Sequence, residues 1–326
     1  MPDPVLFAKA VAAAAVAGIV VTLAAAVAFA KLQRLIRKQS APTATRMGVA
    51  VILGIALGSA VGFHLLGDIP PRSLEGSFPH WAVSNVLDRF LFVILPLAGW
   101  VELHGAFTIV PRWIVWILRL GLAAATGRVL LHGSSYLQGT ASDWSLAQVW
   151  TTLSVGAVLL AAVWVLLVWL LRRRPGISLP LALSQTCLAV GMTVMLSGYT
   201  DGGALGLPLA AALAGTVLAA RLLEKLPATE GAVGVGLLGL FGILMMGRFF
   251  GELSTGRALA LFVAPLLCWV TELPPLCARR PWLVGAMRLV LVAIPLAIVL
   301  GLAKNDFDRE MGEPYAAAIS IGHIGH

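Results

Sequence analysis

Two charged residues lie within one of the most apolar stretches of the sequence. Residues 100–119 read WVELHGAFTIVPRWIVWILR, in which Glu102 and Arg119 flank a predicted turn at Pro111. In a helical hairpin, residues equidistant from the turn lie at the same depth. A lone charge inside a bilayer costs several kcal/mol, so such residues usually face the helix bundle and find a partner. We therefore expect Glu102 and Arg119 to contact each other across the hairpin.

A second stretch repeats this pattern. Residues 269–288 read WVTELPPLCARRPWLVGAMR, and Glu272 and Arg288 are again equidistant from a central turn. The simplest interpretation is that each pair stabilises its own hairpin. If the arginines instead face a polar cavity, they would bind a small anionic substrate or a lipid headgroup. A third interpretation, in which long side chains reach the membrane surface, applies best to Glu272 because Pro274 can end its helix.

Four further residues, His104, Arg128, His64 and His132, are weaker candidates for a functional site. His104 is two positions from Glu102, so it lies on another helix face and is interpreted as a core histidine. Arg128 lies within a predicted helix, whereas His64 and His132 end their helices and together could ligate a haem. The sequence contains no HExxH motif, and its three cysteines show no CxxC pattern. We therefore expect no metal and no cofactor.

The composition indicates the environment in which these charges lie. The chain has 326 residues, of which 59% are hydrophobic and 12% charged, and its mean hydropathy is +0.93. Soluble domains contain roughly 25% charged residues, so this chain has too few to cover a water-facing surface. The net charge of +8 does not indicate nucleic-acid binding, because the basic residues lie between apolar blocks rather than in an aromatic-rich patch. The bilayer is the expected surrounding.

The apolar blocks are about twenty residues long, which is the length of helix that crosses a bilayer. The sequence therefore predicts an all-α, polytopic integral membrane protein with about ten transmembrane helices in one membrane domain, residues 1–326. A polar C-terminal tail is expected at 304–326. The ten helices are predicted at about 5–30, 47–67, 89–110, 113–131, 149–171, 179–199, 204–220, 231–250, 257–273 and 282–303.

The two hairpins belong to a longer internal repeat. Residues 45–68 align without gaps to residues 229–252, and Trp100, Pro96 and Arg119 match residues 169 positions later. Corresponding helices are six apart and run in the same direction, so we expect a parallel repeat about an axis along the membrane normal. This 4+2+4 arrangement comprises repeat A at about 5–131, linking helices at about 149–199 and repeat B at about 204–303.

The orientation follows from the basic residues. The segment AFA at 28–30 resembles a signal-peptidase site, but the chain starts MPDPVLFAK rather than with a basic segment, so we predict an uncleaved helix. With the N-terminus outside, the predicted inner segments carry more than twice as many lysines and arginines as the outer ones. This bias is typical of the cytoplasmic side. We expect a plasma or inner membrane protein with both termini outside.

No nucleophile elbow, phosphate-binding loop or dinucleotide fingerprint is present, so an enzyme is not indicated. Repeats and intramembrane charges favour a transporter, permease or flippase-like protein that moves a small or anionic substrate between the two repeats. The alternative is a non-catalytic integral subunit or scaffold that binds partner membrane subunits. A third alternative is a haem-bearing electron-transfer subunit that uses His64 and His132.

The orientation can be tested with reporters. Alkaline phosphatase fused after His326 should be active and green fluorescent protein at that site dark, because both termini are predicted outside. Fusions in the loop that contains Arg173 should show the opposite pattern. A phosphatase that is inactive after His326 while the fluorescent protein there is bright would contradict this topology.

Overall fold

The computed structural model describes residues 4–35, 43–66, 85–106, 110–141, 144–223, 230–277 and 280–322. The fold is all-helical, with no strand in these ranges. Within them, nine helices are long and apolar enough to cross a membrane. The protein is therefore a multi-pass membrane protein, as the composition predicts.

Most predicted spans correspond to one long helix each. The predicted third span, 89–110, instead corresponds to a helical run over 86–106 that consists of three successive elements. The elements are α1 (Pro4–Leu35), α2 (Thr43–Leu65), α3 (Val86–Arg89), the π-helix η2 (Phe90–Ile94), α4 (Leu95–Ala106), α5 (Arg112–Leu131), α6 (Ser135–Gln138), α7 (Leu146–Arg173), α8 (Ser178–Leu196), α9 (Thr200–Ala204), α10 (Gly206–Leu222), α11 (Glu230–Phe250), α12 (Thr255–Val263), the 3₁₀-helix η4 (Ala264–Glu272), α13 (Pro274–Cys277) and α14 (Pro281–Gly322).

Two of the helical runs that the sequence predicts as spans change helix type next to a proline. The π-helix η2 ends just before Pro96, and the 3₁₀-helix η4 begins just before Pro265. Proline has no N–H and its ring displaces the preceding turn, so the regular α-helical hydrogen bonds are interrupted there. These two prolines are 169 residues apart, the offset that also relates Arg119 to Arg288.

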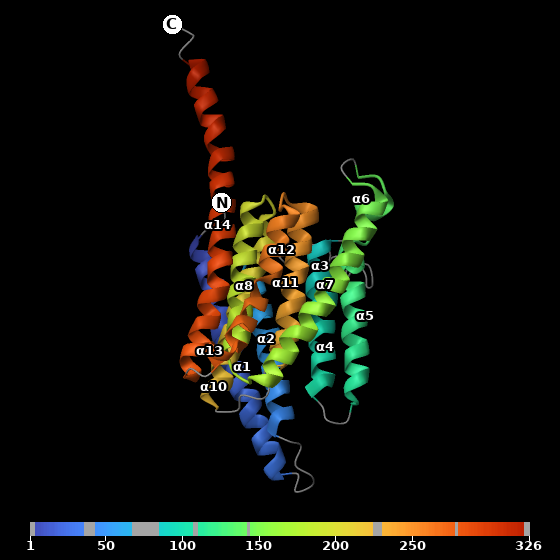
Figure 1. The fold of residues 1–326 in the computed structure, drawn as a ribbon, viewed down its shortest axis with the longest axis vertical. Coiled ribbons are helices and arrows are strands. Elements are labelled where there is room, and N and C mark those ends of the chain that lie inside the picture. The colour runs from blue at the N-terminus through green and yellow to red at the C-terminus, as the bar shows by residue number, and fades with distance from the viewer. Residues whose placement is uncertain are drawn as a thin grey trace.

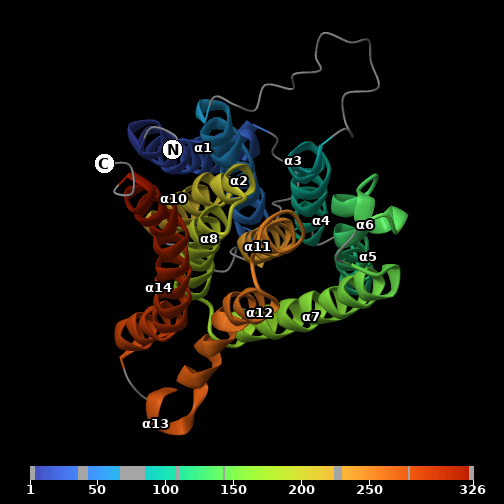
Figure 2. The ribbon, with the colours of Figure 1, turned by 90° about the horizontal axis from the view of Figure 1, so that it is seen from above.

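Helix α11 forms the centre of the bundle. It packs against α2, α4, α5, α7, α8 and α10, among which it lies in Figure 2. It is buried along almost its whole length. Its glycines let neighbouring side chains lie directly on its backbone. Phe90 covers Gly242 and Leu209 covers Gly239, so that a β-carbon at either glycine would overlap the covering side chain. Close contact through small residues is a common basis of helix association in membranes.

Helices α1, α2 and α10 form a second closely packed group. A β-carbon added at Gly215 of α10 would lie 2.4 Å from the backbone oxygen of Ala15 in α1. One added at Gly58 of α2 would lie 2.8 Å from the backbone oxygen of Ala14. The three backbones therefore approach as closely as glycine allows.

Helix α1 begins and α14 ends at the same end of the bundle, and α14 extends beyond the other helices (Figure 1). The predicted end of the last helix near residue 303 is wrong, because α14 continues to Gly322. The expected polar tail is thus helical over most of its length. Polarity does not break a helix by itself, and Lys304 and Asp308 form an ion pair one turn apart that supports it.

The close packing of α1 against α10 predicts a specific sensitivity. Gly215→Ala should lower the free energy of unfolding in detergent by roughly 1–3 kcal/mol, because the new methyl group meets backbone that cannot move aside. Gly121→Ala is the matched control, since a β-carbon at Gly121 of α5 meets nothing within 4 Å. The control should be unchanged or more stable by up to about 1 kcal/mol. Equal effects of the two substitutions would contradict the predicted packing.

Candidate functional site

Glu102 and Arg119 form a two-point ion pair across the α4–α5 hairpin. Arg119 Nε donates to Glu102 Oε1 at 2.9 Å, and Arg119 Nη2 donates to Glu102 Oε2 at 2.7 Å. The side chains are only 3% and 1% exposed. The expected contact across the hairpin is therefore confirmed. Planar, two-point pairing of guanidinium and carboxylate is the strongest geometry for such a pair.

The surroundings enclose this pair on several sides. The guanidinium of Arg119 lies 4.9 Å from the ring centre of Trp116 and 5.6 Å from that of Trp164. The carboxylate of Glu102 lies against the bare backbone of α11, where a β-carbon at Gly234 would be 2.1 Å from Oε1. Arg119 thus has a full counter-charge, two aromatic faces and little room for another ligand.

Arg288 has a different set of partners. Its Nε donates to Thr271 Oγ1 at 2.9 Å, its Nη1 to Ser178 Oγ at 3.1 Å and its Nη2 to Glu272 Oε1 at 2.9 Å. The pairing of Glu272 with Arg288 was expected and is confirmed. The second carboxylate oxygen of Glu272 lies 3.5 Å from Arg174 Nε, so this one carboxylate serves two guanidinium groups.

Thr271 is a site residue that the sequence reasoning missed. At the offset of 169 residues, the counterpart of Glu102 is Thr271 rather than Glu272. In both hairpins the residue at this position accepts the hydrogen bond from the arginine Nε, 17 residues further along the chain. Strict use of the offset would have identified Thr271. Ser178 lies on α8, outside both hairpins, and no local pattern marks it.

Arg288 lines a cavity of about 940 Å³ at the end of the bundle where α7 and α10 end and α8 and α14 begin. We call this the basic cavity. Among the residues that the structure describes, four arginines and a single carboxylate border it. Its charged and hydroxyl residues are Arg173, Arg174, Arg221, Arg288, Glu272 and Ser178.

Two helix N-termini border the basic cavity. Ser178 begins α8 and Pro281 begins α14, and neither helix has an acidic residue in its first turn. The N-terminus of a helix carries a partial positive charge and unbonded N–H groups. These dipoles add to the charge of the arginines, so the cavity can hold an anion.

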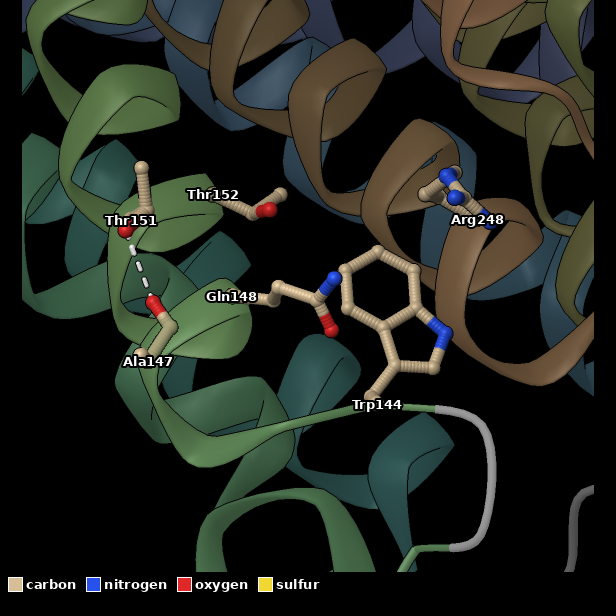
Figure 3. A pocket seen from close by; sticks show the side chains of 6 residues that line it. All are labelled: Trp144, Ala147, Gln148, Thr151, Thr152 and Arg248. Atoms are coloured by element: carbon tan, nitrogen blue, oxygen red, sulfur yellow. Dashed lines mark hydrogen bonds between the residues drawn. The ribbon is translucent and has the colours of Figure 1, made fainter.

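A second polar pocket lies at the other end of α7. We call it the Trp144 pocket; it has a volume of about 440 Å³, and Trp144, Ala147, Gln148, Thr151, Thr152 and Arg248 line it (Figure 3). The Trp144 ring lies between Gln148 and Arg248, and the guanidinium of Arg248 is 4.5 Å from the ring centre. Arg248 Nε also donates to Thr255 Oγ1 at 2.9 Å. The wall of this pocket therefore combines an aromatic ring, an amide and a guanidinium.

Two of the weaker candidates make local contacts only. The ring nitrogen Nδ1 of His104 is 2.8 Å from the carbonyl oxygen of Trp100, one turn earlier in α4, and the two rings are in contact. The exposed Arg128 lies over the ring of Trp150. Neither residue belongs to the basic cavity or the Trp144 pocket.

His64 and His132 have different surroundings. His64 lines a largely apolar cavity of about 600 Å³ between α2 and α4, and His132 is not among the residues that line it. His132 is exposed at the end of α5, and its carbonyl accepts a hydrogen bond from Arg89. Across the described ranges, three or more His, Cys, Asp or Glu residues nowhere gather as a metal site would require.

Comparison with known proteins finds no matching protein family, no similar curated protein and no similar solved structure. The function must therefore be argued from the geometry of the site. A fold alone would not decide it in any case, because unrelated functions share folds.

The closed environment of the first pair predicts strong energetic coupling. Glu102→Gln and Arg119→Gln should each lower the free energy of unfolding by about 3 kcal/mol, because each leaves a buried charge without its partner. The double variant should lose less than the sum of the two single losses, since it leaves no unpaired charge. Chemical unfolding of the four proteins in detergent measures this coupling. Additive losses would show that the two charges do not depend on each other.

Proposed function

We propose that the protein is a membrane transporter, permease or flippase-like protein that accepts an anionic substrate in the basic cavity. The observation that carries this proposal is the excess of positive charge on the cavity wall. In the described part of the wall, four arginines face one carboxylate, and that carboxylate is shared between Arg174 and Arg288. A structural ion pair needs no such excess, as the closed pair of Glu102 and Arg119 demonstrates.

The two ends of α7 provide access from both sides of the bundle. Gln148 lies in the Trp144 pocket and Arg173 in the basic cavity. Because an α-helix rises 1.5 Å per residue, these residues are about 37 Å apart along the helix, which exceeds the hydrocarbon thickness of a bilayer. Polar cavities at opposite faces are what a substrate needs to enter and to leave.

Between the two cavities α7 is packed against the core. Leu160, Val163, Trp164 and Leu167 are buried in this stretch. Transport would therefore require a second conformation that opens the space beside α7. The π-helix η2 and the 3₁₀-helix η4 are suited to such a change, because irregular turns inside spanning helices often mark hinges.

We further propose that the two hairpins arose by duplication and are related by an axis along the membrane normal. Shared helix irregularity near Pro96 and Pro265 supports this, as do the equivalent hydrogen bonds of Arg119 and Arg288. The basic cavity would then lie on the inner side of the plasma or inner membrane, with both termini outside.

The alternative, a non-catalytic subunit or scaffold for partner membrane subunits, is supported by one observation. Helix α14 extends beyond the other helices over many residues, which offers a surface to another protein (Figure 1). The haem-bearing alternative would require His64 and His132 on one cavity, and no cavity described above contains both.

Reconstitution into vesicles tests the transport proposal. Two probes are used, a fluorescent phosphatidylglycerol whose outer-leaflet fraction is quenched by dithionite, and radiolabelled inorganic phosphate. At least one probe should cross faster than in protein-free vesicles. Arg174→Gln should slow that probe about fivefold at low substrate concentration, since one arginine near an anionic group contributes about 1 kcal/mol.

Arg172→Gln is the matched control, because Arg172 lies two residues away and pairs with Glu230 at an exposed site rather than lining the cavity. Its transport rate should equal that of the unaltered protein. If neither probe crosses faster than in empty vesicles, the transport proposal is wrong. If both variants slow transport equally, the basic cavity is not the entry site.

A further inference from the structure

We infer that the basic cavity binds the phosphate group of an anionic phospholipid from the adjacent leaflet. This inference deepens the proposed function, since it names the substrate class of the same site. It rests on three independent properties of the cavity, which are the balance of charge, the position of the hydroxyl groups and the nature of the walls.

The charge balance leaves guanidinium groups available to a ligand. Both carboxylate oxygens of Glu272 are engaged, one by Arg288 and one by Arg174. Among the described residues, neither Arg173 nor Arg221 has a carboxylate partner. Arg173 lies instead 4.1 Å from the ring centre of Trp169, which orients its guanidinium without neutralising it. A phosphate would supply the missing negative charge.

The buried end of the cavity is preorganised. Arg288 is 4% exposed in its side chain and is held by Thr271, Ser178 and Glu272, so its guanidinium cannot turn away from the cavity. Ser178 also begins α8, whose positive N-terminal end points to the same space. Fixed donors and helix N-termini together form the usual protein site for a phosphate.

The apolar part of the cavity wall favours a lipid over a soluble anion. Ile177, Leu181, Val284 and Leu289 line the cavity beside the arginines. Trp282, which also lines it, is 66% exposed at the start of α14 and is placed as an interfacial anchor. A free phosphate would leave this apolar surface uncovered, whereas a phospholipid covers it with its glycerol and acyl chains. Basic pockets between transmembrane helices commonly bind anionic headgroups in this way.

The volume is also suitable. A cavity of about 940 Å³ is at the upper end of the range of small-molecule sites, roughly 300–1,000 Å³. It therefore has room for a headgroup together with the first part of its chains. The Trp144 pocket, at about 440 Å³, is smaller and has a single arginine.

Lipid retention by the purified full-length protein tests this inference. The protein is incubated with mixed vesicles of phosphatidylcholine and phosphatidylglycerol and re-purified, and the bound lipids are counted by native mass spectrometry. Phosphatidylglycerol should be retained in preference to phosphatidylcholine. Arg173→Gln combined with Arg221→Gln should weaken its binding about 30-fold, because two arginines near the headgroup contribute about 2 kcal/mol.

The matched control is Arg112→Gln combined with Arg172→Gln, which removes the same charge from exposed positions outside the cavity. It should retain phosphatidylglycerol as the unaltered protein does. Both double variants change exposed side chains only, so thermal unfolding should confirm that they fold. If the cavity variant and the control variant lose the lipid equally, its binding depends on net charge alone, and the inference that the basic cavity binds it is wrong.

Three further outcomes distinguish a lipid ligand from a soluble anion, and the lipid site from the transport proposal. If inorganic phosphate displaces the retained lipid, or raises the unfolding temperature as much as phosphatidylglycerol does, the ligand is a soluble anion and the inference is wrong. If cavity-dependent lipid binding is found but no probe crosses the vesicle membrane, the lipid site stands and transport fails. If phosphate crosses through the cavity without lipid binding, transport stands and the lipid site fails.

Discussion

A guanidinium group buried between apolar helices requires a counter-charge at its own depth, and this constraint shapes both hairpins. At Arg119 it is met in full by Glu102, through two hydrogen bonds in a closed environment. The carboxylate can lie there only because α11 presents Gly234 without a side chain. The close packing of α4 and α5 around α11 thus depends on one ion pair and one missing β-carbon. Without the ion pair a charge would be buried alone, and with a side chain at Gly234 the carboxylate would overlap it. Both changes lower stability.

The second hairpin meets the same constraint incompletely. Its glutamate is displaced by one position relative to the first, and a one-residue step turns a side chain by about 120° in a 3₁₀-helix. Thr271 therefore occupies the place of the carboxylate beside Arg288 Nε, and Glu272 lies between Arg288 and Arg174. A neutral hydroxyl satisfies the hydrogen bond but not the charge. The remaining positive charge is the basis of the proposal that the basic cavity binds an anion.

Much of the membrane fold and both ion pairs could be predicted from the sequence, because apolar length and equal depth in a hairpin are local properties. The contributions of Ser178 and Gly234 could not, since Ser178 lies on a helix far along the chain from Arg288 and Gly234 on a helix far along the chain from Glu102. The sequence also did not predict which helical segments are π or 3₁₀, because apolar periodicity does not distinguish π and 3₁₀ turns from α turns. The end of α14 was misplaced for a related reason, since polarity marks the membrane boundary and not the end of a helix.

The two hairpins differ in how their arginines are neutralised. In the first hairpin, Glu102 pairs with Arg119 alone among the described residues, so one carboxylate balances one guanidinium. In the second hairpin, Glu272 is shared between Arg288 and Arg174, so one carboxylate faces two guanidinium groups. Arg288 donates three hydrogen bonds, and two of its acceptors are the neutral hydroxyls of Thr271 and Ser178, so the two hairpins differ in the charge that surrounds the arginine. A bound phosphate would restore at the second hairpin the balance that Glu102 provides at the first, which makes the ligand the electrostatic equivalent of the missing carboxylate.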